Sequence, residues 1–73
     1  MKIYTKLSDD YKPRRDCNLA TKLRLQVALD TAPHGLTYDQ CAHACRGHYN
    51  PGWKGYHDEH TFLNYVIAHG HLI

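Results

Sequence analysis

The chain has 73 residues and a formal net charge of +2, with 42% apolar and 11% aromatic residues. These values predict one folded domain that spans residues 1–73, and they argue against a disordered protein. A chain of this size buries only about 60% of its unfolded surface, which leaves little core for a multi-substrate enzyme. No apolar run approaches the roughly 18 residues of a membrane span, and the first residues lack the apolar region of a signal peptide.

The cysteine count and the distribution of charge say more about the kind of protein this is. Three cysteines are an odd number for a secreted disulfide scaffold, so we expect reduced thiols in a cytosolic protein. Residues 1–24 hold seven Lys and Arg against three Asp, a net charge of +4, whereas residues 25–73 hold two against four acidic residues, a net charge of −2. All seven histidines lie in that second part. The first third of the chain is therefore basic, and the remainder is rich in histidine.

The first half of the chain predicts a strand, an arm and a helix. Residues 2–7 alternate loosely between apolar and polar positions, which favours one short strand. Residues 8–16 are polar and contain Pro13, so we expect a flexible basic arm or loop. Either Asp16 or Asn18 can cap the next helix, which should end near residue 31. Its apolar residues form a stripe at helical spacing. The stripe contains Leu19, Leu23 and Val27, and Ala20 and Leu29 widen it.

The second half predicts two further helices. Thr37 and Gln40 have capping-box spacing, and Cys41, Ala44 and Cys45 then share one face. The last helix should begin near residue 58, and its apolar residues again recur at helical spacing. They are Phe62, Leu63, Val66 and Ile67, and Gly70 follows where a left-handed residue is expected.

The remaining segments indicate turns and short strands. Residues 51–52 (Pro-Gly) favour a type II turn in the loop 46–57, whose flanks could pair as a hairpin. Residues 71–73 could add an edge strand beside residues 3–7. The sequence therefore predicts an α+β, mostly helical domain of helix-turn-helix or winged-helix-like type, with three helices and short strands at the termini. A plain three-helix fold with ordered arms is the competing prediction.

The sequence gives weak support to metal binding and to catalysis. Cys41, Cys45, His48 and His57 are zinc-type ligands, but their spacing matches none of the familiar finger or ribbon patterns. The simpler interpretation makes both cysteines small core residues at a tight helix crossing. We therefore predict no metal and no other cofactor, and keep a zinc-binding structural module as an alternative. The chain has no nucleophile-elbow motif and no Gly-rich phosphate loop, so we predict no enzyme.

Binding of a macromolecule is the better-supported class. The arm could neutralise phosphates, but residues 58–69, where a recognition helix would lie, contain no Lys or Arg. A small nucleic-acid-binding protein of helix-turn-helix type is therefore possible but not favoured. Tyr and Arg are enriched in protein-binding hot spots. The predicted surface for a protein partner consists of Tyr4, Lys6, Tyr11, Lys12, Arg14 and Arg15.

The chain as a whole also resembles a known group of proteins. Residues 1–7 (MKIYTKL), the arm residues 12–15 (KPRR) and the helix-turn-helix-like second part are similar to small phage-encoded inhibitors of bacterial RNA polymerase, such as early transcription regulators of Xanthomonas phages. No family motif can be transferred residue by residue.

The resemblance implies a monomeric protein without enzymatic activity, in the cytoplasm of the bacterial host. It implies binding near the N-terminus of the β′ subunit of RNA polymerase. It further implies inhibition of transcription initiation, by disturbing the sigma-containing holoenzyme, and an effect on termination as an antiterminator.

Overall fold

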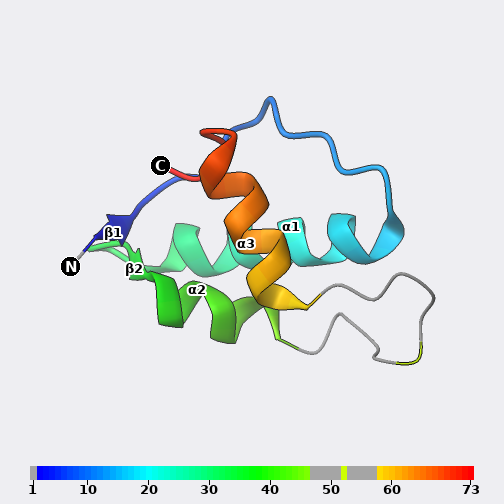
Figure 1. The fold of residues 1–73 in the computed structure, drawn as a ribbon. Coiled ribbons are helices and arrows are strands. Elements are labelled where there is room, and N and C mark those ends of the chain that lie inside the picture. The colour runs from blue at the N-terminus through cyan, green and yellow to red at the C-terminus, as the bar shows by residue number, and fades with distance from the viewer. Residues whose placement is uncertain (1, 47–51, 53–57) are drawn as a thin grey trace.

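A computed structural model describes residues 2–46, 52 and 58–73 of the chain. Figure 1 shows three helices and two short strands in the order β1 (Ile3–Tyr4), α1 (Asp16–Thr31), β2 (Leu36–Thr37), α2 (Tyr38–Cys45) and α3 (Glu59–Ala68). The strands form a two-stranded antiparallel sheet. The predicted α+β class with three helices is therefore confirmed, while a winged-helix arrangement stays a prediction. Among the described residues, no helix is long and apolar enough to cross a membrane.

The starts of α2 and α3 follow from their capping residues. The Thr37 hydroxyl accepts a hydrogen bond from the Gln40 amide, and the Gln40 side chain accepts one from the Thr37 amide, which completes the predicted capping box. Asp58 caps α3 by accepting from the Thr61 amide at 2.9 Å. Gly70, just after α3, has a φ of +74°, as expected of a residue that ends a helix in the left-handed region. These local predictions are confirmed.

Two predictions for α1 are wrong. The cap of this helix is Arg15, without a side-chain cap hydrogen bond, and neither Asp16 nor Asn18 takes that position. The face that points inward consists of Thr21, Leu25 and Leu29. The apolar stripe read from the sequence points mostly to solvent. Its members Leu19, Leu23 and Val27 are 45%, 58% and 62% exposed.

The N-terminal segment is held in place by β2, from the middle of the chain, and by the C-terminal tail. In the sheet, Ile3 is opposite Thr37 and Tyr4 is opposite Leu36. Gly35 precedes β2 with a φ of +80°, and any Cβ there would lie 2.7 Å from the Tyr4 carbonyl oxygen. Beyond β1, Leu7 forms a bridge with Leu72, so the predicted pairing of the C-terminal tail with this segment is confirmed. The predicted strand over residues 2–7 is shorter, with only Ile3–Tyr4 in the sheet.

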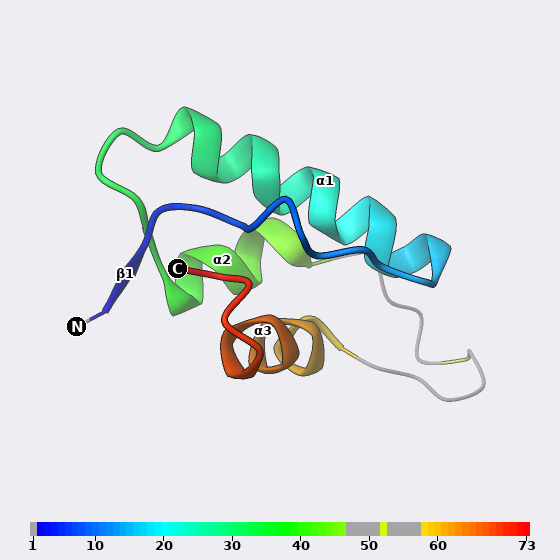
Figure 2. The same cartoon turned by 90° about the horizontal axis from the view of Figure 1, so that it is seen from above.

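The core lies beneath this segment. Figures 1 and 2 show residues 5–15 arching over the helices from β1 at one end of the molecule to the start of α1 at the other. The segment contributes two side chains to the core, Leu7 and Tyr11, and β1, the helices and the C-terminal tail supply the rest. The buried apolar residues are Tyr4, Leu7, Tyr11, Leu25, Leu29, Cys41, Ala42, Cys45, Phe62, Leu63, Val66 and Leu72. The arching segment is therefore part of the fold, and this fixes the position of the basic residues that it carries.

Candidate binding groove

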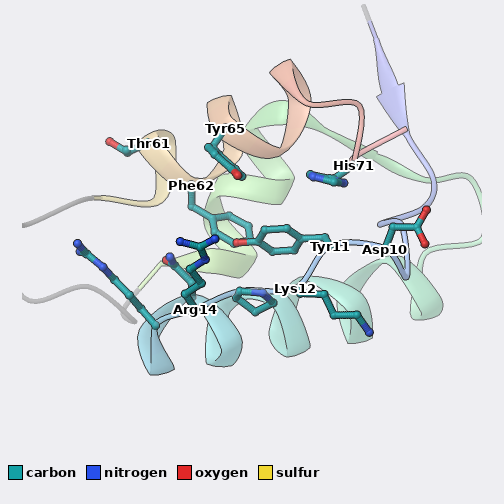
Figure 3. A pocket seen from close by; sticks show the side chains of 11 residues that line it. Asp10, Tyr11, Lys12, Arg14, Thr61, Phe62, Tyr65 and His71 are labelled. Atoms are coloured by element: carbon teal, nitrogen blue, oxygen red, sulfur yellow. The ribbon is translucent and has the colours of Figure 1, made fainter.

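A groove of about 640 Å³ lies between α3 and residues 10–15, which we call the basic segment (Figure 3). One wall is residues 10–15, which precede α1, and the other is α3 with the start of the C-terminal tail. These walls are about fifty residues apart in sequence, and only the fold brings them together. The lining residues are Asp10, Tyr11, Lys12, Pro13, Arg14, Arg15, Asn18, Thr61, Phe62, Tyr65 and His71.

Tyr11 anchors the segment and forms the floor of the groove with Phe62. The two rings meet edge to face, with centroids 5.8 Å apart, and their residues are only 6% and 4% exposed. The Tyr11 carbonyl oxygen accepts a 2.7 Å hydrogen bond from the Lys22 ammonium, which also lies 5.8 Å from the centroid of the Tyr11 ring. Burial is the main cause that raises the pKa of the Tyr11 phenol, and Tyr65 and Cys17 add smaller effects. This residue therefore stays neutral and fixes the residues that follow it.

The α3 wall presents aromatic surface to solvent. Tyr65 is 52% exposed, and its ring centroid lies 6.2 Å from that of Tyr11 and 4.2 Å from that of His69. His71, at the start of the tail, stands 5.2 Å from Tyr11 and stacks on Tyr65 at 6.5 Å. Partly exposed aromatic rings bring apolar area and a polar tip to a binding site. The groove therefore has an apolar floor and one wall that offers an open π face.

The opposite wall is cationic. Lys12, Arg14 and Arg15 are exposed, and none of them forms an ion pair with another residue that the structure describes. Asp10 provides the single carboxylate of the lining. In Figure 3, Asp10 and His71 lie toward one end, and Arg14 and Thr61 lie toward the other. The groove therefore differs at its two ends, because Arg14 lies at one end and the Asp10 carboxylate at the other, while the Lys12 side chain points away from Arg14.

The structure brings together four of the six residues predicted to contact a partner. Tyr11, Lys12, Arg14 and Arg15 line the groove, whereas Tyr4 and Lys6 do not. Tyr4 is 6% exposed in the core, and Lys6 is exposed on the stretch that pairs with Ile73. The sequence interpretation missed four residues of the opposite wall. They are Thr61, Phe62, Tyr65 and His71.

A signal for the missed wall was present in the sequence. Tyr65 follows Phe62 by three residues, so both project toward neighbouring positions of one helical face. The sequence interpretation counted Phe62 among the apolar residues of this helix and left Tyr65 out.

The candidate metal ligands fall into two groups. The Cys41 and Cys45 side chains are wholly buried, and burial raises the pKa of their thiols to about 11 and about 12. Zinc binds the thiolate, which this environment disfavours. His48 and His57 lie outside the described residues, as does the predicted hairpin. Within the part of the chain that the structure describes, no three metal-binding side chains gather.

A second, shallower hollow of about 470 Å³ lies between the end of α1 and α2. It is mostly apolar and carries no Lys or Arg in its lining. The lining residues are Ala28, Thr31, Ala32, Leu36, Asp39, Gln40, His43 and Ala44. This second hollow lacks convergent charges. The groove beside α3 is therefore the stronger candidate site.

Comparison with known proteins found no match to a family model, a curated protein or a solved structure.

Proposed function

We propose that this protein is a phage regulator that binds host bacterial RNA polymerase through the groove between the basic segment and α3. Two things support the proposal. One is the resemblance of the whole chain to phage inhibitors of this enzyme. The other is the groove itself, where Lys12, Arg14 and Arg15 lie opposite exposed Tyr65 and form no ion pair with any described residue. Arg and Tyr side chains held in place around a buried floor are typical of protein-binding hot spots.

The observation that carries this proposal is the anchoring of the basic segment. Because Tyr11 is packed on Phe62 and held by Lys22, the backbone that carries the cationic residues after it requires little ordering when a partner binds. Basic residues at the rim also speed association with an acidic surface. The target is the β′ N-terminal region. Binding there inhibits initiation by disturbing the sigma-containing holoenzyme, and the same contact acts on termination.

The test is retention of purified polymerase holoenzyme by the immobilised protein. The double variant Arg14→Glu/Arg15→Glu should reduce retention by at least about tenfold at physiological salt. The control Lys2→Glu/Arg24→Glu changes net charge equally at exposed positions outside the groove, and it should retain polymerase like the wild type. Equal retention by both variants, or no retention by the wild type, would refute the proposal.

A transcription assay follows from the same variants. Wild-type protein added before promoter DNA should reduce initiation and the amount of sigma recovered with the polymerase, and it should increase readthrough at a terminator. Arg14→Glu/Arg15→Glu should lose all three effects together, because one surface produces them. Loss of binding without loss of inhibition would separate the groove from the activity.

Direct nucleic-acid binding by a helix-turn-helix-like domain is the alternative. It has weaker support, because α3 carries neither Lys nor Arg and a helix that reads the major groove normally supplies them. A gel shift with DNA and RNA alone, repeated over a salt series, decides between the two. The zinc-module alternative predicts that a chelator lowers the melting temperature, and we expect no change.

A further inference from the structure

We infer that the groove takes a short acidic peptide segment whose carboxylates face Arg14 and Arg15 and whose neighbouring aromatic side chain rests on Tyr65. This inference rests on the proposed function, in that the segment belongs to the polymerase. It adds the chemistry of that segment and its direction in the groove.

The charges of the groove determine the charge of the peptide that binds and the end of the groove at which its acidic residues lie. Three cations line one wall, and the single carboxylate, Asp10, lies toward the opposite end from Arg14 (Figure 3). A carboxylate near Arg14 or Arg15 gains charge-assisted, bidentate hydrogen bonds, whereas one near Asp10 is repelled. The acidic residues of the segment therefore lie at the Arg14 end, and the Asp10 end favours neutral or basic residues.

The apolar part of the groove favours one large side chain beside those carboxylates. Phe62 and Tyr11 close the floor, and the exposed Tyr65 ring provides a face against which an aromatic ring can pack. Aromatic pairs stabilise a contact beyond the area that they bury. Tyr65 lies one helical turn from Thr61, which is at the Arg14 end of the same wall, so the stacked ring and the paired carboxylate are expected close together along the segment.

The size of the groove limits the occupant to a few residues. Its volume of about 640 Å³ lies within the roughly 300–1,000 Å³ of sites that enclose a ligand. A single-stranded nucleic acid fits the lining less well. Stacking platforms for bases use successive exposed rings, but Tyr11 and Phe62 are 6% and 4% exposed, which leaves Tyr65 with the partly buried His71 beside it. Asp10 also opposes a phosphate backbone that would run through the whole groove.

The probes are capped synthetic peptides that carry Phe followed by two Glu, and matched peptides with Gln in place of Glu or Ala in place of Phe. We expect the Glu peptide to bind about tenfold more tightly than the Gln peptide. Arg14→Gln/Arg15→Gln should remove that ratio, and Tyr65→Ala should weaken both peptides that contain Phe. Lys2→Gln/Arg24→Gln serves as the charge-matched control and should leave the ratio unchanged.

The direction is tested with a peptide that carries Glu on both sides of Phe. Asp10→Asn should tighten binding of this peptide and leave the first Glu peptide unaffected. Equal binding of Glu and Gln peptides, or a preference that survives in Arg14→Gln/Arg15→Gln, overturns the inference. So does displacement of the Glu peptide from the groove by a single-stranded oligonucleotide at lower concentration.

The outcome separates this inference from the proposed function. Polymerase retention without discrimination between the peptides leaves the proposed function standing and refutes the inferred occupant. Discrimination between the peptides without polymerase retention confirms the occupant class and refutes the polymerase as its source.

Discussion

The two long faces of α1 are similar in composition but differ in their surroundings. The inner face carries Thr21, Leu25 and Leu29, which are buried against the rest of the core. The outer face carries Leu19, Leu23 and Val27, and all three are about half exposed. The outer face is at least as apolar as the inner one. Apolar spacing along this helix therefore does not determine which face is buried.

The partners of the inner face explain the difference. α1 packs mainly on α2, where Cys41, Ala42 and Cys45 form a surface of small side chains. Leu25 and Leu29 fit against that surface, and the segment above supplies Leu7 and Tyr11. Once those positions are filled, no element among residues 2–46 and 58–73 remains to cover the outer face. Tertiary packing decides between two stripes that the helix offers equally.

The strongest test of this comparison replaces one leucine on each face. Leu25 is 0% exposed and Leu23 is 58% exposed. We expect Leu25→Ala to lower the free energy of unfolding by about 2–5 kcal/mol, because it leaves a cavity, and Leu23→Ala to change it by less than about 1 kcal/mol. Denaturant unfolding of both variants provides the measurement. Equal losses would mean that the outer face is covered in solution.

The reactivity of the three thiols should also differ with their burial. Cys17 is partly exposed on α1, whereas Cys41 and Cys45 are wholly buried on the surface that the inner face covers. Burial raises the pKa of the two α2 thiols to about 11 and about 12, so they are neither accessible nor ionised near neutral pH.

A thiol reagent should therefore label Cys17 first. We expect Cys41 and Cys45 to react at least about a hundredfold more slowly, at a rate that follows unfolding. The variant Cys17→Ser should abolish the fast phase and leave the slow one. A fast phase that persists in this variant would contradict the burial of the α2 thiols.

A smaller effect is expected at two threonines of α1 that differ in burial. Thr21 is wholly buried and its hydroxyl donates to the Cys17 carbonyl oxygen at 2.7 Å, while Thr31 is exposed and donates to the Val27 carbonyl oxygen at 3.1 Å. Substitution by Ser keeps each hydroxyl and removes one methyl group. Thr21→Ser should cost about 1 kcal/mol and Thr31→Ser less than about 0.5 kcal/mol, measured by thermal and denaturant unfolding.

The smallest effect concerns acid stability at the start of α3. The hydrogen bond from the Thr61 amide is the main cause that lowers the pKa of Asp58 below its ordinary value of 3.8. A carboxyl with a lower pKa in the folded state stabilises the fold fully above its ordinary pKa, and this contribution is lost as the pH falls through the lowered value. Asp58→Asn keeps the cap acceptor without the charge.

The melting temperature of the wild type should therefore fall more steeply than that of Asp58→Asn between about pH 5 and pH 2. Above pH 5 the two proteins should follow parallel curves. Parallel curves over the whole range would show that the Asp58 charge contributes nothing to the fold.

Local chemistry explains which parts of the fold the sequence could predict. Thr37 with Gln40, Asp58 and Gly70 act on backbone groups within a few residues, so their roles are readable without a fold. The inner face of α1 depended on elements far along the chain and was not readable in this way. The same holds for the Tyr11 ring, which was predicted as a partner contact and lies in the core.

The groove also shows how far local sequence can predict a binding site. Its cationic wall was predicted, because Lys12, Arg14 and Arg15 are neighbours in sequence. Its aromatic wall was not, because nothing local joins residue 15 to residue 65. The contacts of Tyr11 with Phe62 and Tyr65 bring the two walls together, and these contacts form only when the chain is folded.

The pairing of the two ends has a consequence for how the chain is synthesised. The amides of Thr5 and Lys6 both donate to the Ile73 carbonyl oxygen, and the Ser8 amide donates to that of His71. A ribosome produces residues 5–8 first and residues 71–73 more than sixty residues later. The N-terminal segment must therefore wait for its partners while more than sixty further residues are synthesised, and contacts of such long sequence separation form slowly. During that interval Leu7 and Tyr11 are exposed to chaperones and proteases, and the groove does not yet exist.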